Sequence, residues 1–285
     1  MYTPRLRPSS FHVLNTRTTA LTVSGAIIAA LAIVLSGGRE TEAAQIVVMG
    51  DSWAKRIGPA LTTVAREDGF SVANAGMGLT AAEMATHPNY IEQTLAANPD
   101  AQVVHLSIGG NDILDFTPAI SERSVAQRNQ LLSTVTANVQ TIVDRIAAVR
   151  PSVEVYHVSY DFLPSLPGQG TPSEVNAAFL EQASALESGI VSDRYTYLNN
   201  YGFGQLAMGI PALSLAPGDP SLPKLDQPGP AALFGDPIHL NDVGYSTYAE
   251  LTFGQYRSSL RVPEPSGPFL SAIAIGLGGL SRRGR

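Results

Sequence analysis

The chain has 285 residues, of which 44% are hydrophobic and 15% charged, with a formal net charge of −6 and no cysteine. This composition supports a sizeable core and excludes a disordered acidic chain, and the length suits one large α/β domain or two smaller ones. The lack of cysteine excludes disulfides, thiolate metal sites and a cysteine nucleophile, and the acidic balance argues against nucleic acid as a partner.

The first 44 residues have the pattern of an export signal. Three arginines precede an uncharged run over 18–38, whose centre, AIIAALAIVL, is continuously apolar. A basic flank followed by an apolar stretch and small residues is typical of a signal peptide, with cleavage near Ala43 or Ala44. Because the run approaches the length of a membrane span, a retained transmembrane helix is the alternative.

Residues 45–260 alternate short apolar runs with stretches of helical periodicity. The apolar runs predict five strands, at 45–49, 71–74, 102–108, 153–159 and 195–199. Helices are expected at 54–68, 121–150, 173–193 and 242–259, with Ser173 as the cap of the third. Strands that alternate with helices predict a parallel sheet, and burial on both faces explains why the strands are almost wholly apolar.

One segment of this middle region does not follow the alternation. Residues 201–235 are dense in glycine and proline and show little periodicity. Irregular chain of this length inside a compact domain is typical of a lid or a binding loop, and a surface insertion is the alternative.

Three polar clusters lie where a parallel sheet places its functional sites, beyond the carboxyl ends of the strands. They are GDSW at 50–53, GGND at 109–112 and DPIH at 236–239. Together they meet the needs of a serine hydrolase: Ser52 is the candidate nucleophile, His239 its base, and Asp236 the carboxylate that orients the imidazole. The Ser52 amide, a glycine amide after the second strand and the Asn111 side chain are candidate oxyanion donors.

These motifs, in this order, resemble the SGNH (GDSL-type) hydrolase and esterase superfamily over about 45–259. The resemblance implies a flavodoxin-like, three-layer α/β/α sandwich with a five-stranded parallel sheet. It also implies Ser52 as nucleophile, Asn111 as oxyanion donor, and Asp236 and His239 as the other triad members. The usual leucine of the GDSL motif is Trp53 in this chain.

The block after the second strand departs from the family pattern, because Asn74-Ala-Gly-Met-Gly-Leu-Thr80 is one residue shorter. Gly78 fits the oxyanion glycine best, and Gly76 is the alternative. We expect no cofactor and no metal ion, since the His, Asp and Glu residues lack the spacing of metal ligands. His105 and His157 lie within predicted strands and are expected to be core residues.

The C-terminal segment, 261–285, is the most specific targeting feature. Arg261-Val-Pro-Glu-Pro-Ser266 precedes an apolar run over 267–280 and a final Ser-Arg-Arg-Gly-Arg. This order resembles the PEP-CTERM sorting signal of Gram-negative bacteria. The resemblance implies export, transit through the inner membrane, and processing by an exosortase, with release to the periplasm, cell surface or extracellular matrix. A plain amphipathic or buried C-terminal helix is the alternative.

The sequence as a whole predicts one hydrolase domain, 45–260, between two targeting segments. Our hypothesis is an exported serine esterase that cleaves acetyl or short acyl esters through an acyl-enzyme, with acetylated polysaccharide as a candidate substrate. One alternative is a non-catalytic protein that binds glycan or matrix on a hydrolase scaffold. Another is a membrane-anchored interaction protein. Thioesterase and lysophospholipase activities stay open, because fold and triad do not fix the substrate.

Overall fold

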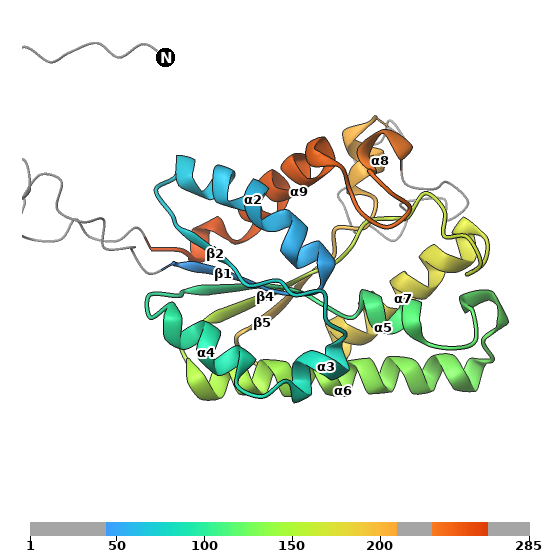
Figure 1. The fold of residues 1–285 in the computed structure, drawn as a ribbon, viewed down its shortest axis with the longest axis horizontal. Helices are drawn as coiled ribbons and strands as arrows, with labels where there is room; N and C mark the ends of the chain where they lie inside the picture. The colour runs from blue at the N-terminus through green and yellow to red at the C-terminus, as the bar shows by residue number, and fades with distance from the viewer. Residues whose placement is uncertain (1–43, 210–229, 262–285) are drawn as a thin grey trace, which may run out of the picture. The chain divides into compact units, whose positions relative to one another are not determined.

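Five short parallel strands form one sheet in the order β2-β1-β3-β4-β5 (Figure 1). The computed structural model describes residues 44–209 and 230–261. The strands are β1 (Ile46–Gly50), β2 (Val72–Asn74), β3 (Val103–Ser107), β4 (Glu154–Val158) and β5 (Tyr195–Leu198). Every neighbouring pair is parallel. The predicted fold class and all five predicted strands are therefore confirmed.

Burial explains why the central strands were readable from the sequence. All residues of β1 and β3 are buried, so both faces of these strands need apolar side chains. The edge strands β2 and β5 are only partly buried and carry more polar residues. The core therefore lies along the middle of the sheet, and the residues that follow β1 and β3 come out side by side at its carboxyl edge.

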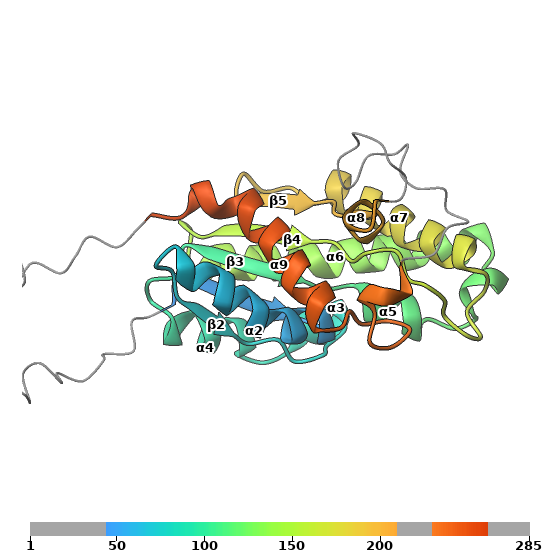
Figure 2. The same ribbon diagram turned by 90° about the horizontal axis from the view of Figure 1, so that it is seen from above.

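Helices cover both faces of the sheet and give the three layers (Figures 1 and 2). Helices α2 (Ser52–Glu67) and α9 (Asp242–Tyr256) pack together on one face. On the other face, α6 (Val125–Val149) packs against α3 (Ala81–Thr86), α4 (Tyr90–Ala97) and α7 (Pro172–Gly189). The sequence analysis missed α3, α4 and α5 (Gly110–Asp115), which are too short to show a clear period.

Capping boxes correct the predicted helix starts. Ser124 and Gln127 cap α6, so the predicted start at residue 121 is wrong, and a separate 3₁₀ turn, η1 (Ile120–Glu122), precedes the helix. Thr171, rather than Ser173, caps α7 through its reciprocal bonds with Glu174. In both helices the side chain of the capping Ser or Thr accepts a hydrogen bond from the backbone amide three residues later. The Glu or Gln at that later position accepts one in return from the amide of the capping residue.

The prediction that 201–235 is irregular is wrong at both described ends of the segment. Helix α8 (Phe203–Ala207) and the 3₁₀ turn η2 (Ala231–Leu233) lie there. The carboxylate of Asp161 accepts hydrogen bonds from the amides of Gly202 and Gly204, at 2.8 and 3.2 Å. Helix α8 therefore begins against a carboxylate from a distant part of the chain. No periodicity within 201–235 reveals such a contact. Residues 210–229 lie outside the described part.

The two predicted targeting segments, 1–44 and 261–285, lie outside the described residues except for Ala44 and Arg261. Neither the export signal nor the sorting signal is therefore tested by the structure. Among the helices within 44–209 and 230–261, none combines the length and the apolar character needed to cross a membrane.

Candidate active site

A sharp turn after β1 places Ser52 at the carboxyl edge of the sheet. Gly50 adopts a φ of +128°, and a Cβ there would collide with the Ser107 carbonyl oxygen of the adjacent strand, so only glycine fits. Asp51 then caps α2, its Oδ1 accepting from the Trp53 amide at 2.9 Å. Ser52 is the first residue of α2, two residues before the predicted helix start at 54, and an amide at this position has no partner within its own helix.

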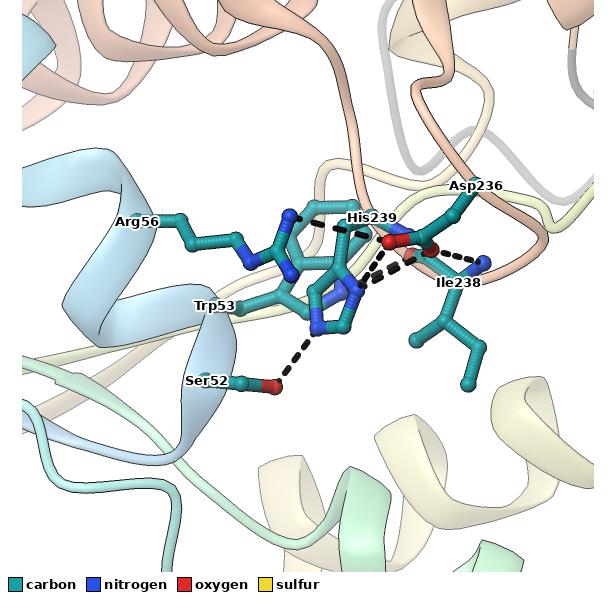
Figure 3. A network of polar contacts seen from close by, with 6 residues as sticks. All are labelled: Ser52, Trp53, Arg56, Asp236, Ile238 and His239. Atoms are coloured by element: carbon teal, nitrogen blue, oxygen red, sulfur yellow. Dashed lines mark hydrogen bonds and ion pairs between the residues drawn. The ribbon is translucent and has the colours of Figure 1, made fainter.

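The three predicted triad residues form a continuous hydrogen-bonded chain (Figure 3). Ser52 Oγ lies 2.8 Å from His239 Nε2, and His239 Nδ1 lies 3.0 and 2.9 Å from the two oxygens of Asp236. An ionised carboxylate only accepts, so Nδ1 carries the proton and Nε2 is the acceptor for the serine hydroxyl. This is the arrangement in which an imidazole can take the proton of a serine nucleophile.

Asp236 also builds the turn that presents the histidine. Its Oδ1 accepts from the amides of Ile238 and His239, at 2.9 and 2.7 Å. The segment is a bend and not a helical turn, although a spacing of three residues also matches about one turn of a helix. Desolvation raises the pKa of Asp236, but the hydrogen bonds from these two amides and the contact with the imidazole outweigh it. The net result is a pKa below the ordinary value. The carboxylate therefore stays ionised at neutral pH.

Arg56 is a charged neighbour of the triad that the sequence analysis missed. Its Nη1 lies 3.6 Å from Asp236 Oδ2, and both side chains are substantially exposed, at 48% and 38% (Figure 3). The available signal was its position on the helix, four residues after Ser52, which places the two side chains on the same face. Arg56 and His239 therefore share one carboxylate.

Asn111 and Gly78 also meet at this edge. Asn111, in the first turn of α5, points its Nδ2 at the carbonyl oxygens of Gly78 and Leu79, at 3.1 and 3.2 Å. This contact ties the loop after β2 to the helix after β3. To serve an oxyanion, one Asn111 N–H must turn from a carbonyl toward the substrate, a rearrangement that is common when a catalytic site is filled.

The two candidate glycines of that loop differ in their surroundings. The Gly76 amide donates to Asn74 Oδ1 at 3.1 Å, and a Cβ at Gly76 would collide with the Lys55 backbone. The Gly78 amide donates to no described residue, and open space surrounds the position of its missing Cβ. Gly76 therefore has a packing role, and of the two only Gly78 has an amide available for a substrate.

A narrow cleft adjoins the candidate nucleophile. Ser52 and Asn111 both line it, so the candidate nucleophile and the candidate oxyanion donor face one space. Its remaining walls are mainly apolar and come from four different parts of the chain; they include Leu114, Leu163, Phe179 and Ile238. Apolar walls with a few converging polar groups are typical of a site for a small organic molecule.

Two buried aromatic side chains support the site and were not identified from the sequence. Trp53 Nε1 donates to the Ile238 carbonyl oxygen at 3.1 Å, so helix α2, which begins at Ser52, contacts the bend that carries His239. The Tyr160 hydroxyl donates to Asp51 and accepts from the Gly110 amide at 2.7 Å. Aromatic residues are ordinary core material, and no local pattern distinguishes one that carries such a bond.

The other titratable groups near the sheet edge have structural partners. Burial raises the pKa values of Asp51 and Asp161 to about 7. Burial also raises the pKa of Asp112, whose carboxyl accepts a hydrogen bond from the Ala81 amide at 2.7 Å. Burial lowers the pKa of His105 to about 3 and that of His157 to about 4, in agreement with their predicted place in the core. Over the described residues no cluster of His, Asp and Glu is arranged to hold a metal ion.

Fold and site together define an α/β protein with a five-stranded parallel sheet and a Ser-His-Asp constellation at the carboxyl edge of that sheet. The chain belongs to the DUF459 family, described as a protein of unknown function, whose model matches residues 45–194, just over half of its length. No protein of curated function matches the sequence.

Solved structures share the fold at low sequence identity. One, from Bacteroides fragilis and assigned as an acylhydrolase, has a TM-score of 0.52 at 14% identity and covers 79% of this chain and 90% of that chain. A lipase from a goat rumen metagenome has a TM-score of 0.50 at 16% identity, covering 76% and 97%. A Streptococcus pneumonia protein assigned as a platelet activating factor has a TM-score of 0.50 at 16% identity, covering 82% and 99%.

Proposed function

We propose that this protein is a serine esterase that cleaves carboxylic esters through an acyl-enzyme. The observation that carries the proposal is the unbroken chain from Ser52 Oγ through His239 to Asp236, with contacts of 2.8 to 3.0 Å. The fold that it shares with an acylhydrolase and a lipase is consistent with this chemistry. A non-catalytic binding protein would have no need to keep all three groups in register.

The geometry assigns each group one role in the reaction. Ser52 Oγ attacks the ester carbonyl while its proton passes to His239 Nε2, and the same proton then goes to the departing alcohol. A water molecule repeats the attack on the acyl-serine, with His239 again taking and returning the proton, and the acid is released. Asp236 holds the imidazole in the required tautomer and stabilises its charged form.

The oxyanion site of the proposed enzyme consists of the Ser52 amide, the Gly78 amide and the Asn111 side chain. The Ser52 amide has no intrahelical partner, and the Gly78 amide donates to no described residue. Each donor of this kind typically contributes about 10²–10³ in rate. Exchange of Asn111 for Ala is therefore expected to lower kcat by two to three orders of magnitude, and a loss below about fivefold removes Asn111 from this role.

The cleft favours a short acyl group. It is narrow, and its walls are mainly apolar, so it suits a small apolar group better than a long chain. Acetyl and other short apolar acyl groups match such a space, and acetyl groups on polysaccharide are our candidate natural substrate. A series of p-nitrophenyl esters tests the size limit: kcat/KM should fall at least about tenfold from butyrate to octanoate. Equal values for both contradict the assignment of the cleft.

The decisive experiment compares the purified full-length chain with Ser52→Ala. Wild type should turn over p-nitrophenyl acetate and react with a fluorophosphonate, whereas the variant should do neither, because the nucleophile is gone. Equal turnover by both proteins refutes the proposal. A wild type inert in both assays favours the alternative of a glycan- or matrix-binding protein on a hydrolase scaffold.

We also propose that the enzyme is exported from a Gram-negative cell and processed by an exosortase on its way to the periplasm, surface or matrix. The support lies in the sequence: the arginine-flanked apolar run within 1–44, and the Pro-Glu-Pro triplet, apolar run and arginine cluster of 261–285. Cell fractionation with mass spectrometry of the mature chain tests both. Recovery of the intact chain from the cytosol contradicts them.

A further inference from the structure

Tyr160 joins two parts of the candidate site that lie far apart in the sequence. The side chain is buried, and its hydroxyl bridges the carboxyl of Asp51 and the amide of Gly110. Asp51 directly precedes Ser52, and Gly110 directly precedes Asn111. The phenol therefore contacts the residue before the nucleophile and the residue before the proposed oxyanion donor.

Each end of the bridge is fixed to the start of a helix. Asp51 caps α2 through its other oxygen, which accepts from the Trp53 amide at 2.9 Å. Gly110 is the first residue of α5, and Gln182 Nε2 donates to the carbonyl of the preceding Gly109 at 2.8 Å. A change in the length of the bridge would therefore move one helix start relative to the other.

The hydrogen-bond directions leave the phenol only one arrangement. The Gly110 amide can only donate and an ionised Asp51 can only accept, so with Asp51 ionised the Tyr160 oxygen accepts from Gly110 and its own hydrogen goes to Asp51. Burial, together with the adjacent Asp51, raises the pKa of Tyr160 well above its ordinary value, so the phenol keeps this hydrogen.

The second glycine of the GGND motif is explained by the same contact. A Cβ at Gly110 would lie 2.6 Å from Cζ of the Tyr160 ring, closer than packed carbon atoms approach. Glycine at this position is what lets the backbone amide reach the phenol. The motif and the tyrosine, which are 50 residues apart, are thus complementary parts of one bridge.

We infer that Tyr160 is a positioning residue that sets the placement of Asn111 relative to Ser52. This inference rests on the proposed esterase function, since it concerns how the nucleophile and the oxyanion donor are brought together. Small displacements of catalytic groups lower the rate of a reaction more than the binding of its substrate, because the geometry demanded by the transition state is the stricter one.

The test uses Tyr160→Phe in the full-length protein, with Tyr245→Phe as its matched control. Tyr245 is another buried tyrosine against the Trp53 ring, but its hydroxyl has no hydrogen-bond partner among the described residues. Rates with p-nitrophenyl acetate are expressed per site that reacts with a fluorophosphonate, so unfolded protein does not count. Tyr160→Phe should lower kcat at least about tenfold with KM within about twofold of wild type, and the control should change neither.

A double-mutant cycle with Asn111→Ala separates positioning from general damage. If Tyr160 acts by placing Asn111, adding Tyr160→Phe to Asn111→Ala should lower kcat by less than about threefold further. The full tenfold loss in both backgrounds overturns the inference, as does a Tyr160→Phe enzyme with the kcat of its control. In both cases an active wild type leaves the esterase proposal standing, whereas a wild type inert toward esters and fluorophosphonate contradicts both.

Discussion

The exchange of Trp53 for Phe tests whether α2, which begins with the proposed nucleophile Ser52, holds the proposed base His239 in place. Trp53 is the only tryptophan of the chain and is buried. Its indole packs edge-on against Tyr160, Tyr245 and Tyr248, with ring centroids 5.4 to 5.8 Å apart. Its Nε1 donates to the carbonyl oxygen of Ile238 at 3.1 Å. Phenylalanine keeps an aromatic ring here and removes the donor.

The structure sets the expected size of the effect. The peptide group between Ile238 and His239 is held at both ends, by Trp53 at its oxygen and by Asp236 at its nitrogen. Loss of one such bond costs about 1 kcal/mol, and the smaller ring gives up about 1 kcal/mol of aromatic contact. We expect the free energy of unfolding to fall by about 2 kcal/mol. If the lost hydrogen bond, worth about 1 kcal/mol, also stabilises the transition state of the reaction, kcat should fall by roughly fivefold.

Two measurements decide this prediction. Urea unfolding followed by circular dichroism gives the change in stability, since the variant has no tryptophan fluorescence, and p-nitrophenyl acetate gives kcat. Tyr245→Phe is the control, because it removes from the same aromatic cluster a hydroxyl that has no partner in the described part of the chain. A Trp53→Phe protein within about 0.5 kcal/mol and twofold of wild type, and so indistinguishable from its control, would refute the assigned role.

Three further changes follow from single contacts. Arg56→Gln should alter stability by less than about 1 kcal/mol in thermal unfolding, because its pair with Asp236 is exposed; a larger loss contradicts this. Gly110→Ala should destabilise by about 1–3 kcal/mol and lower kcat, since the new Cβ meets the Tyr160 ring, and a neutral change argues against that contact. Burial raises the pKa of Asp161 to about 7, so folding takes up a proton between pH 4 and 7. Relative to Asp161→Asn, wild type should lose about 1.4 kcal/mol of stability per pH unit as pH rises through this window; parallel curves of unfolding free energy against pH disprove it.

The sheet was predictable because its central strands leave a strong signal in the sequence. Strands buried on both faces carry mostly apolar residues, and the runs at 45–49 and 102–108 match β1 and β3 to within one residue at each end. Helices α3 and α5 have six residues each, too few for an apolar period to appear. The start of α3 depends instead on the cap Thr80, which is harder to distinguish from an ordinary turn, and α5 starts after Gly109 with no side-chain cap.

The triad residues were predictable because the chemistry restricts the residue types. A serine that opens a helix after a buried strand and a histidine close to an aspartate each occur in a recognisable local pattern, and the structure places Ser52, Asp236 and His239 in contact. The local conformation was less predictable. Asp236 reaches His239 through a bend stabilised by its own side chain, so the spacing of three residues does not reflect a helix.

The residues that hold the catalytic groups in place were not predictable, because their contacts join distant parts of the chain. Trp53 and Ile238 are 185 residues apart, and Tyr160 and Asp51 are 109 apart. No local pattern relates the members of such pairs. A buried tryptophan or tyrosine has the same signature in the sequence whether or not its polar atom carries a bond, so only the fold reveals which ones do.

These two supports are themselves in contact, which has a consequence for the site. Trp53 and Tyr160 pack edge to face at 5.4 Å, one bonded to the histidine turn and the other to the helix that carries Asn111. In the sequence, Ser52 directly precedes Trp53 and directly follows Asp51, the residue whose carboxyl accepts the hydrogen bond from Tyr160. Because close-packed side chains transmit displacement, a shift of one ring moves the other. If the proposed roles hold, this aromatic contact couples the position of the base to that of the oxyanion donor, both relative to Ser52.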